Sequence, residues 1–297
     1  MASMTTKDSA VSSGPADFDG VLLLGATGRL GSMLRRHWPE PQALRSQSRQ
    51  PRPGFYNFDL PAAGEGPSDA AISAARGARA VISLAGVTPA RAGGCGAPLE
   101  DNVTLALAAL KLAQAAAVPR FFVASSAAVY GAQDGPLRED MPCAPLSEYG
   151  RQKLAMEKAV REAGGKTAVT ALRIGNVAGA DAILGGWQPA MQIDRFPDGA
   201  TPSRSYIGPV TLARVLCALC HVDDLPPVLN IAAPGAVQMG ALLDAAGLAW
   251  QPKPAPVTAI PEVRLDTNAL ECHVDFTPET QTPAGLVREW QQDMNKR

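Results

Sequence analysis

The chain has 297 residues, enough for one large α/β domain or for a nucleotide-binding domain with a smaller appended region. Hydrophobic residues make up 46% of it and charged residues 19%, the composition of a globular protein with a sizeable core. A net charge of −1 gives no electrostatic basis for binding nucleic acid or a membrane surface, and no apolar run is long enough to span a bilayer, so we expect a small-molecule substrate.

The first segment, residues 1–18, is rich in Ser, Ala, Thr and Gly and shows no hydrophobic periodicity. It lacks the basic start and the apolar stretch of a secretory signal, so we interpret it as a disordered tail. The five cysteines are scattered and odd in number, which fits a reducing compartment better than a disulfide framework. These features predict a cytoplasmic protein.

Short apolar runs alternate with helical stretches from residue 21 onward. Strands are predicted at residues 21–24, 43–48, 55–60, 80–85, 120–125 and 169–174, and helices at 30–37, 102–117 and 148–163. The strands show little polar alternation, which indicates burial on both faces, and the intervening helices indicate parallel crossovers. The pattern predicts an α/β doubly wound parallel sheet, a Rossmann fold, over residues 19–178.

The rhythm changes after residue 178, where Pro and Gly become frequent. A helix is predicted at 210–221, and a further strand within 228–235 is expected to return to the main sheet. Residues 179–227 and 236–297 are expected to form a small C-terminal substrate-binding cap, because such segments commonly close over the carboxyl edge of a sheet.

A glycine-rich turn, Gly25-x-x-Gly28-x-x-Gly31, lies where the first strand gives way to the first helix. Glycine permits the tight turn, the close approach of a pyrophosphate and the close packing of helix on strand, while the helix N-terminus attracts phosphate. A purely structural turn is the alternative. The residues expected to contact a dinucleotide here are Gly25, Thr27, Gly28, Arg29, Leu30 and Gly31.

The end of the second predicted strand bears on the choice of cofactor. An acidic residue that would bind a ribose 2′-hydroxyl is missing there, and Arg49 follows the strand instead. A guanidinium suits a 2′-phosphate, so we predict NADP(H) in preference to NAD(H). Asp59, which closes the third strand, is expected to reach the adenine. The alternatives are a solvated surface arginine and an ordinary turn carboxylate.

Tyr149 and Lys153 stand four residues apart on a predicted helix and therefore share one face. An ammonium beside a phenol favours the phenolate, so Tyr149 is predicted to exchange a proton with a substrate hydroxyl or carbonyl. Lys153 is also expected to bind the nicotinamide ribose. Ser126, at the carboxyl end of the fifth strand, is predicted to hold the substrate oxygen. Each residue alone has a structural interpretation, but the set occurs in order behind a dinucleotide turn.

These motifs resemble the extended short-chain dehydrogenase/reductase superfamily, in particular its NAD-dependent epimerase/dehydratase branch. The resemblance covers residues from about 20 to 235. Its motifs are Gly25-x-x-Gly28-x-x-Gly31, Ser126 with Val129-Tyr130-Gly131, Tyr149-x-x-x-Lys153 and Leu172-Arg173-Ile174-Gly175-Asn176-Val177.

The resemblance implies a Rossmann fold, a Ser126–Tyr149–Lys153 catalytic set and often a homodimer, in which helices such as 102–117 and 149–163 form a four-helix bundle. It implies a mainly structural role for Asn102 and places Leu84, Ala85 and Gly86 along the cofactor channel. Asn176, together with Ser126, is assigned to substrate binding.

Departures from the family pattern limit the chemistry. Sugar dehydratases of this family carry an acidic pair after the catalytic hydroxyl, where this chain has Ala127 and Ala128, so dehydration is not expected. Arg204 is expected to meet an anionic group of the substrate. However, the residues after Ile207 differ from those of family members that act on nucleotide sugars, and a solvated Arg204 is the alternative.

Cys217-Ala-Leu-Cys220-His221 spells the covalent haem-attachment pattern. That chemistry normally requires export, and the segment 210–221 reads as an amphipathic helix in which Cys acts as a small buried hydrophobe. No second pair of ligands lies at zinc-site spacing. We therefore predict neither haem nor another metal.

The function predicted from the sequence is an NAD(P)-dependent oxidoreductase or epimerase that acts on a hydroxyl or carbonyl carbon of a small molecule, with sugars among the candidates. One alternative is a non-catalytic NADP(H)-binding sensor that regulates a partner. A sensor has no need of an intact Ser126–Tyr149–Lys153 set, and the intact glycine turn disfavours a scaffold with a vestigial cleft.

Overall fold

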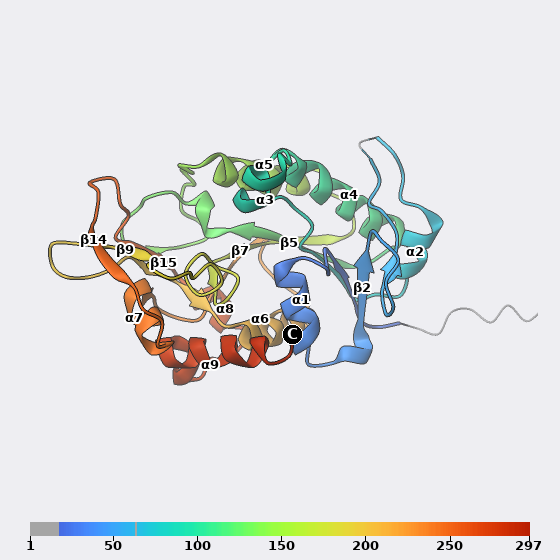
Figure 1. Ribbon diagram of the computed structural model, residues 1–297. Helices are drawn as coiled ribbons and strands as arrows, with labels where there is room; N and C mark the ends of the chain where they lie inside the picture. Colours follow the sequence, from blue (N-terminus) through green and yellow to red (C-terminus); the bar gives the residue numbers. More distant parts are fainter. Residues whose placement is uncertain (1–17, 63) are drawn as a thin grey trace, which may run out of the picture.

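Seven parallel strands form the central sheet of the computed structural model, which describes residues 18–62 and 64–297 (Figure 1). The sheet order is β12-β7-β5-β4-β1-β2-β3. The strands are β1 Val21–Leu24, β2 Leu44–Ser48, β3 Tyr56–Asn57, β4 Ala80–Ser83, β5 Arg120–Ser126, β7 Ala168–Ile174 and β12 Val228–Ile231. The predicted doubly wound parallel sheet is confirmed. Its strand order reverses between β1 and β4, the point at which ligands bind in such sheets.

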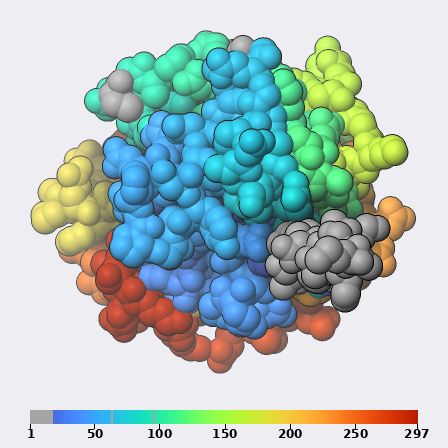
Figure 2. All heavy atoms as spheres, turned by 90° about the vertical axis from the view of Figure 1, so that its right-hand side faces the viewer, coloured from blue at the N-terminus to red at the C-terminus, as the bar shows by residue number. Residues whose placement is uncertain are grey.

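The β3 edge differs from its predicted form. The strand expected at 55–60 is reduced to Tyr56–Asn57, because both residues are exposed and pair only with β2. A helix that the pattern did not predict, α2 (Asp69–Ala75), follows it, capped by Ser68, whose Oγ accepts a hydrogen bond from Ala71 N. Figure 2 views the molecule from this side, where the blue and cyan residues from β2 to α2 form much of the surface.

Helices cover both faces of the sheet (Figure 1). On one face, α1 (Arg29–His37) packs beside α6 (Pro209–Leu219), with α9 (Pro283–Met294) outside them. On the other face lie α4 (Asp101–Ala115) and α5 (Glu148–Glu162), with α2 beside α4. Phe121 and Phe122 of β5 point to opposite faces and are both fully buried, which is worth roughly 1.5–3 kcal/mol for each side chain. The strands that helices cover on both faces therefore supply much of the hydrophobic core.

The C-terminal part, together with the short strands β6 and β8 from earlier in the chain, builds a smaller structure at the end of the sheet near β7 and β12. It contains a four-stranded sheet of order β13-β10-β15-β6 and the pairs β11-β8 and β14-β9. Its own core holds Tyr206, Leu242 and Leu286. Since α6 and α9 pack beside α1, part of the segment expected as a cap covers the main sheet.

The remaining elements are short. They are η1 Pro41–Ala43, α3 Pro89–Cys95, η2 Ala127–Val129, β6 Pro136–Leu137, β8 Asn176–Val177, β9 Gln192–Arg195, β10 Ser203–Arg204, β11 Tyr206–Ile207, β13 Val237–Gln238, α7 Met239–Ala245, β14 Gln251–Pro254, β15 Glu262–Leu265, α8 Asn268–Glu271 and η3 Pro278–Gln281.

The segment expected to be a disordered tail lies outside the described residues, except for Phe18. The centroid of the Phe18 ring lies 3.5 Å from the Arg45 guanidinium carbon, and the Phe18 backbone lies close to Gly77. The described chain therefore begins on a packed aromatic side chain. Among these residues, none of the helices combines the length and apolar character that crossing a membrane requires.

Candidate active site

The first turn of α5 places Tyr149 next to the end of β5. Ser147 caps the helix by accepting a hydrogen bond from Gly150 N at 3.1 Å, and Glu148 complements the helix dipole. A Cβ at Gly150 would lie 2.5 Å from the Ala128 carbonyl oxygen, so only glycine lets α5 approach the segment after β5 this closely. This approach brings the Tyr149 phenol to Ser126, with which it forms a hydrogen bond.

Lys153 lies one turn further along α5 and is buried. Its Nζ donates a hydrogen bond to the Ala124 carbonyl oxygen at 2.8 Å and lies 5.8 Å from the centroid of the Tyr149 ring. Burial lowers the pKa of Lys153 to about 8, and the charge of Glu157 opposes that shift. Lys153 is therefore a cation at neutral pH, placed to act on Tyr149.

The two hydroxyls of the predicted set meet at the carboxyl end of β5. Ser126 is the last residue of that strand, and its Oγ accepts a hydrogen bond from Ala128 N at 3.2 Å. Burial raises the pKa of Tyr149, while the hydrogen bond from Ser126 lowers it. Before a cofactor adds its positive charge, Tyr149 is thus a neutral phenol within reach of Ser126 and Lys153. The structure brings the three predicted residues together.

Gly86 borders this set from the β4 side. A Cβ there would lie 2.6 Å from Asn102 Oδ1 and 3.5 Å from Lys153 Nζ. Asn102 is buried, donates to the carbonyls of Val87 and Leu99, and accepts from Val87 N, so its amide holds this loop against the start of α4. The segment Leu84–Gly86 therefore connects the glycine turn with Lys153.

The glycine turn adopts the conformation that its residue types require. Gly25 has φ +73°, and a Cβ on it would lie 2.8 Å from Ala85 N. A Cβ on Gly31 would lie 2.4 Å from the Gly25 carbonyl oxygen, so glycine lets α1 pack closely on β1. Gly28 N donates to that same oxygen at 3.0 Å. Turn, helix and the Leu84–Ala85 segment therefore form one close-packed unit.

The start of α1 fits the diphosphate of a dinucleotide. The helix begins after Gly28 with no cap from any described side chain and no acidic residue in its first turn. Its first N–H groups and its positive dipole end thus face the carboxyl edge of the sheet uncompensated. Thr27 and Arg29 are exposed there, Leu30 is partly buried, and Arg29 Nη1 donates to the Ala180 carbonyl oxygen.

Gln47 supports this turn and was missed by the sequence reasoning. Its buried side chain accepts a hydrogen bond from Gly25 N at 3.3 Å and donates to the Phe58 carbonyl oxygen at 2.7 Å. In the sequence, Gln47 is noticeable only as a polar residue in a strand of the central sheet. Its partners Gly25 and Phe58 cannot be inferred from that position.

The arginines near the end of β2 separate into two roles. Arg45 lies over Phe18 and Tyr56 and donates to the carbonyls of Ala74 and Arg76, so it is a packing residue. Arg49 directly follows the strand and is exposed. Asp59 is also exposed, two residues after β3. Their roles toward a cofactor stay predictions.

The two further residues predicted to bind substrate lie on the C-terminal side. Asn176 opens β8, directly beyond β7, and its side chain forms a hydrogen bond with Tyr206. Arg204, on β10, is partly buried, and its guanidinium donates to the carbonyls of Ser203, Ile260 and Pro261. Arg204 is therefore held by the backbone of the small sheet, and binding an anionic substrate would exchange these bonds.

A model of the NAD dependent epimerase/dehydratase family matches residues 21–225. The chain belongs to this family. The match covers the chain from β1 through the glycine turn to helix α5 and strand β7, in agreement with the resemblance stated from the motifs.

Two curated relatives match a shorter stretch of this epimerase/dehydratase-family chain. The UDP-glucose 4-epimerase of Azospirillum brasilense is 39% identical over 84 residues, which are 27% of this chain and 24% of that protein. The UDP-glucose 4-epimerase of Corynebacterium glutamicum is 41% identical over 88 residues, which are 29% of this chain and 27% of that protein. The chain spans about a quarter of the length of these relatives.

Several solved structures share the fold over nearly the whole length of this chain. MoeE5 in complex with UDP-glucose and NAD has a TM-score of 0.70 at 23% identity, covering 93% of this chain and 99% of that chain. The NAD-dependent NDP-hexosamine 5,6-dehydratase TunA has a TM-score of 0.74 at 18% identity, covering 94% and 98%. The Thermus thermophilus UDP-glucose 4-epimerase in complex with NAD has a TM-score of 0.67 at 19% identity, covering 91% and 98%.

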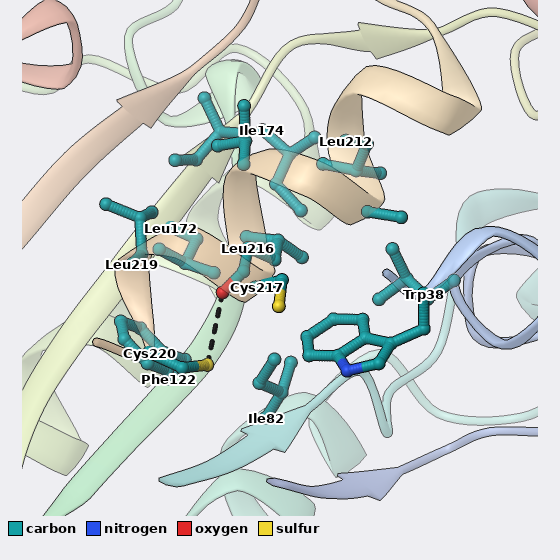
Figure 3. Close-up of a cluster of buried hydrophobic side chains, with 14 of the residues drawn as sticks. Trp38, Ile82, Phe122, Leu172, Ile174, Leu212, Leu216, Cys217, Leu219 and Cys220 are labelled. Carbon is teal, nitrogen blue, oxygen red and sulfur yellow. Dashed lines mark hydrogen bonds between the residues drawn. The ribbon is translucent and has the colours of Figure 1, made fainter. Parts of the chain in front are cut away.

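The two cysteines of the Cys217–His221 motif lie in the core at the end of α6, whereas His221 is exposed. Cys217 and Cys220 are buried against the sheet, and the Cys220 thiol donates to the Leu216 carbonyl oxygen (Figure 3). Haem attachment requires thiols that a porphyrin can reach, whereas these two face apolar side chains. Donor atoms of Glu40, Cys217 and His221 lie within 4.8 Å of one another, and the Arg79 guanidinium contacts His221 Nδ1. A cationic side chain thus already faces this group.

A buried charged network beside the Ser126–Tyr149–Lys153 set was also missed by the sequence reasoning. Glu157 on α5 pairs with Arg173 on β7 at 2.8 Å and accepts a hydrogen bond from Ser125 on β5. Arg173 in turn lies 4.7 Å from the centroid of the Tyr130 ring. The spacing of Glu157, one helical turn after Lys153, is visible in the sequence. Its partners Ser125 and Arg173 are distant in sequence and could not be inferred.

Proposed function

We propose that the protein is an NAD(P)-dependent epimerase or oxidoreductase that acts on a secondary hydroxyl or carbonyl carbon of a small sugar-type substrate. The observation that carries this proposal is the convergence of Ser126, Tyr149 and Lys153 beside Gly86, at the edge of the sheet that also holds the glycine turn. A sensor needs the turn but has no use for a buried lysine beside a phenol.

The chemistry follows from the protonation states. When bound, the nicotinamide ring accepts or delivers hydride at the reacting carbon. Ser126 orients the substrate oxygen, and Tyr149 takes its proton as the carbonyl forms or returns a proton as it is reduced. The Lys153 ammonium stabilises the phenolate form of Tyr149 during that transfer. Oxidation followed by reduction from the other face of the substrate inverts the carbon, whereas a single transfer gives a net redox reaction.

Sugar nucleotides are the first substrate class to test, because both curated relatives are UDP-glucose 4-epimerases. Ala127 and Ala128 form the turn directly after Ser126 and offer no acid or base to expel water. We therefore propose epimerisation or hydride transfer rather than dehydration. Arg204 is the side chain proposed to meet the anionic part of such a substrate.

The test is an assay with purified protein, NAD⁺ or NADP⁺, and a panel of UDP-glucose, UDP-N-acetylglucosamine, UDP-glucuronic acid and the matching free sugars. Product epimers are separated by chromatography, and reduced nicotinamide is followed by absorbance. Tyr149→Phe is expected to lower turnover by about 10²–10⁴-fold while cofactor binding is retained, because only the proton transfer is lost. Tyr56→Phe, an exposed tyrosine on β3, is the control. Full activity of Tyr149→Phe would refute the mechanism, and cofactor binding without turnover of any panel member would favour the sensor.

For the cofactor, we propose a preference for NADP(H), supported by the exposed Arg49 that follows β2. The charge-assisted contact to a 2′-phosphate is worth roughly 1.5–3 kcal/mol, so Arg49→Ala should weaken NADPH binding by about tenfold or more and leave NADH binding unchanged. Nucleotide fluorescence titration measures both, with Arg52→Ala, an exposed arginine of the same loop, as the control. Tighter binding of NADH by the unmodified protein would contradict the preference and leave the enzyme class standing.

A further inference from the structure

Glu157 is the centre of the buried network beneath the catalytic set. Its side chain is 7% exposed, and that of its partner Arg173 is 6% exposed. Arg173 donates to the carboxylate through Nη2 at 2.8 Å and through Nε at 3.1 Å, and Ser125 Oγ donates to Oε1. One carboxylate therefore joins α5 to two neighbouring strands.

The partners of Glu157 stand next to catalytic positions. Ser125 directly precedes Ser126 on β5, and Arg173 lies opposite Ser125 in the β5–β7 register. On α5, Glu157 follows Lys153 by four residues, so both side chains lie on the same face of the helix. The network thus fixes both the end of β5 and the rotation of α5 about its axis.

Stability alone does not account for a charged pair at this place. Elsewhere the interface between α5 and the sheet is apolar and includes Met156, Val160, Phe121 and Val123. Replacing a buried ion pair by well-packed apolar residues is often neutral or stabilising, because both ions lose their hydration. The chain nevertheless keeps the pair where α5 carries its buried lysine.

We propose that Glu157 is a positioning residue for the Ser126–Tyr149–Lys153 set, whose carboxylate sustains the ammonium of Lys153 while its hydrogen bonds join α5 to the ends of β5 and β7. This inference rests on the proposed function only for its catalytic consequence. The physical effect on Lys153 exists in the protein without substrate or cofactor.

The charges around Lys153 set the direction of the effect. Burial lowers the pKa of Lys153 to about 8, and Glu157 opposes that shift. On its own helix Lys153 also faces Tyr149, and Arg173 of β7 lies beyond Glu157. The segment between β5 and α5 brings Tyr130, Glu139 and Cys143 to the network, whereas β5, β4 and α4 present the uncharged Ala124 carbonyl, Gly86 and Asn102.

The first test follows the lysine side chains by NMR in cofactor-free protein labelled at lysine Cε, with Lys153 assigned from the spectrum of Lys153→Met. Glu157→Gln is expected to lower the pKa of Lys153 by about one unit relative to the unmodified protein. Glu157→Asp, which keeps the charge, should restore most of that loss. The matched control is Glu162→Gln, an exposed glutamate on the same helix. An unchanged Lys153 pKa in folded Glu157→Gln would overturn the inference.

Arg173→Gln provides a second variant if Glu157→Gln does not fold. It leaves the carboxylate of Glu157 without its guanidinium partner, so the pKa of Lys153 should rise. Opposite shifts in the two variants are what an electrostatic role requires. If the network were purely structural, both variants would loosen the site and shift the pKa of Lys153 in the same direction. Shifts of the same sign in Glu157→Gln and Arg173→Gln would therefore also overturn the inference.

The catalytic consequence is measured on the substrate found in the panel. Because Lys153 must be charged, the alkaline limb of the kcat profile should move to lower pH by about one unit in Glu157→Gln, with the KM for cofactor unchanged. Turnover by the unmodified protein together with an unmoved limb and an unmoved NMR pKa would sink this inference and leave the proposed function intact. If no panel member is turned over but the NMR pKa of Lys153 still shifts in Glu157→Gln, the inference about Glu157 stands and the proposed function fails.

Discussion

Among the residues that the structure describes, two buried carboxylates pair with arginine, and their surroundings differ. Asp293 on α9 is fully buried and bonds to Arg36 on α1 at 2.8 and 2.9 Å, with His37 at 3.2 Å. Glu157 bonds to Arg173 with similar geometry but lies one helical turn from Lys153. The Asp293 cluster joins α9 to α1, whereas the Glu157 cluster joins α5 to β5 and β7. We propose that the neighbour of a buried ion pair, rather than the pair itself, decides whether the pair contributes to function.

The largest effect that separates the two pairs is expected from Asp293→Asn. The substitution leaves Arg36 and the neighbouring His37 without their anion and should lower the free energy of unfolding by about 3–5 kcal/mol, measured by urea denaturation. The pKa of Lys153 and the pH profile of turnover should stay as they are. A shifted profile in this variant would break the comparison, because it would show that any buried carboxylate acts on the site.

The second prediction concerns Lys153, the neighbour that distinguishes the Glu157 pair from the Asp293 pair. Lys153→Met should change how the free energy of unfolding depends on pH. Burial lowers the pKa of Lys153 from its ordinary 10.5 to about 8 in the folded protein. The unfolded chain therefore binds more protons between these values, and the free energy of unfolding should rise with pH across that interval, by about 3 kcal/mol in total.

This rise should be missing in Lys153→Met. Denaturation at a series of pH values from neutral to alkaline measures the difference between the two proteins. An equal slope in both would mean that Lys153 is solvated in the folded state. The Asp293→Asn protein, which leaves Lys153 in place, should keep the full rise and serves as the control.

Much of the architecture followed from local patterns in the sequence. The apolar run at β1 and the glycines after it specified a strand, a tight turn and a helix, because each residue type has few alternatives there. Even the polar β2 lies close to its predicted range. The helix α2 was missed because its Ala-rich sequence lacks a long apolar face, and α9 because Pro and Gly are frequent in the C-terminal third.

The residues of the candidate site could be placed from the sequence where one element carries them. Tyr149 and Lys153 share a helix, and Ser126 ends a strand that the pattern located. Gln47 and the Ser125–Glu157–Arg173 network could not be found in this way, because each contact joins residues far apart in the chain. Arg204 is a different case. An arginine at this position suggested contact with an anion, but only the structure shows that its guanidinium already donates to main-chain carbonyls.

The hydrogen bond from Lys153 to Ala124 has a consequence for engineering. The acceptor is a main-chain oxygen, so the residue type at position 124 can change without removing it. Libraries that vary side chains along the end of β5 can therefore include position 124, because every member keeps the main-chain oxygen that accepts the hydrogen bond from Lys153. Position 150 offers no such freedom, since any side chain there would push the helix off the strand end.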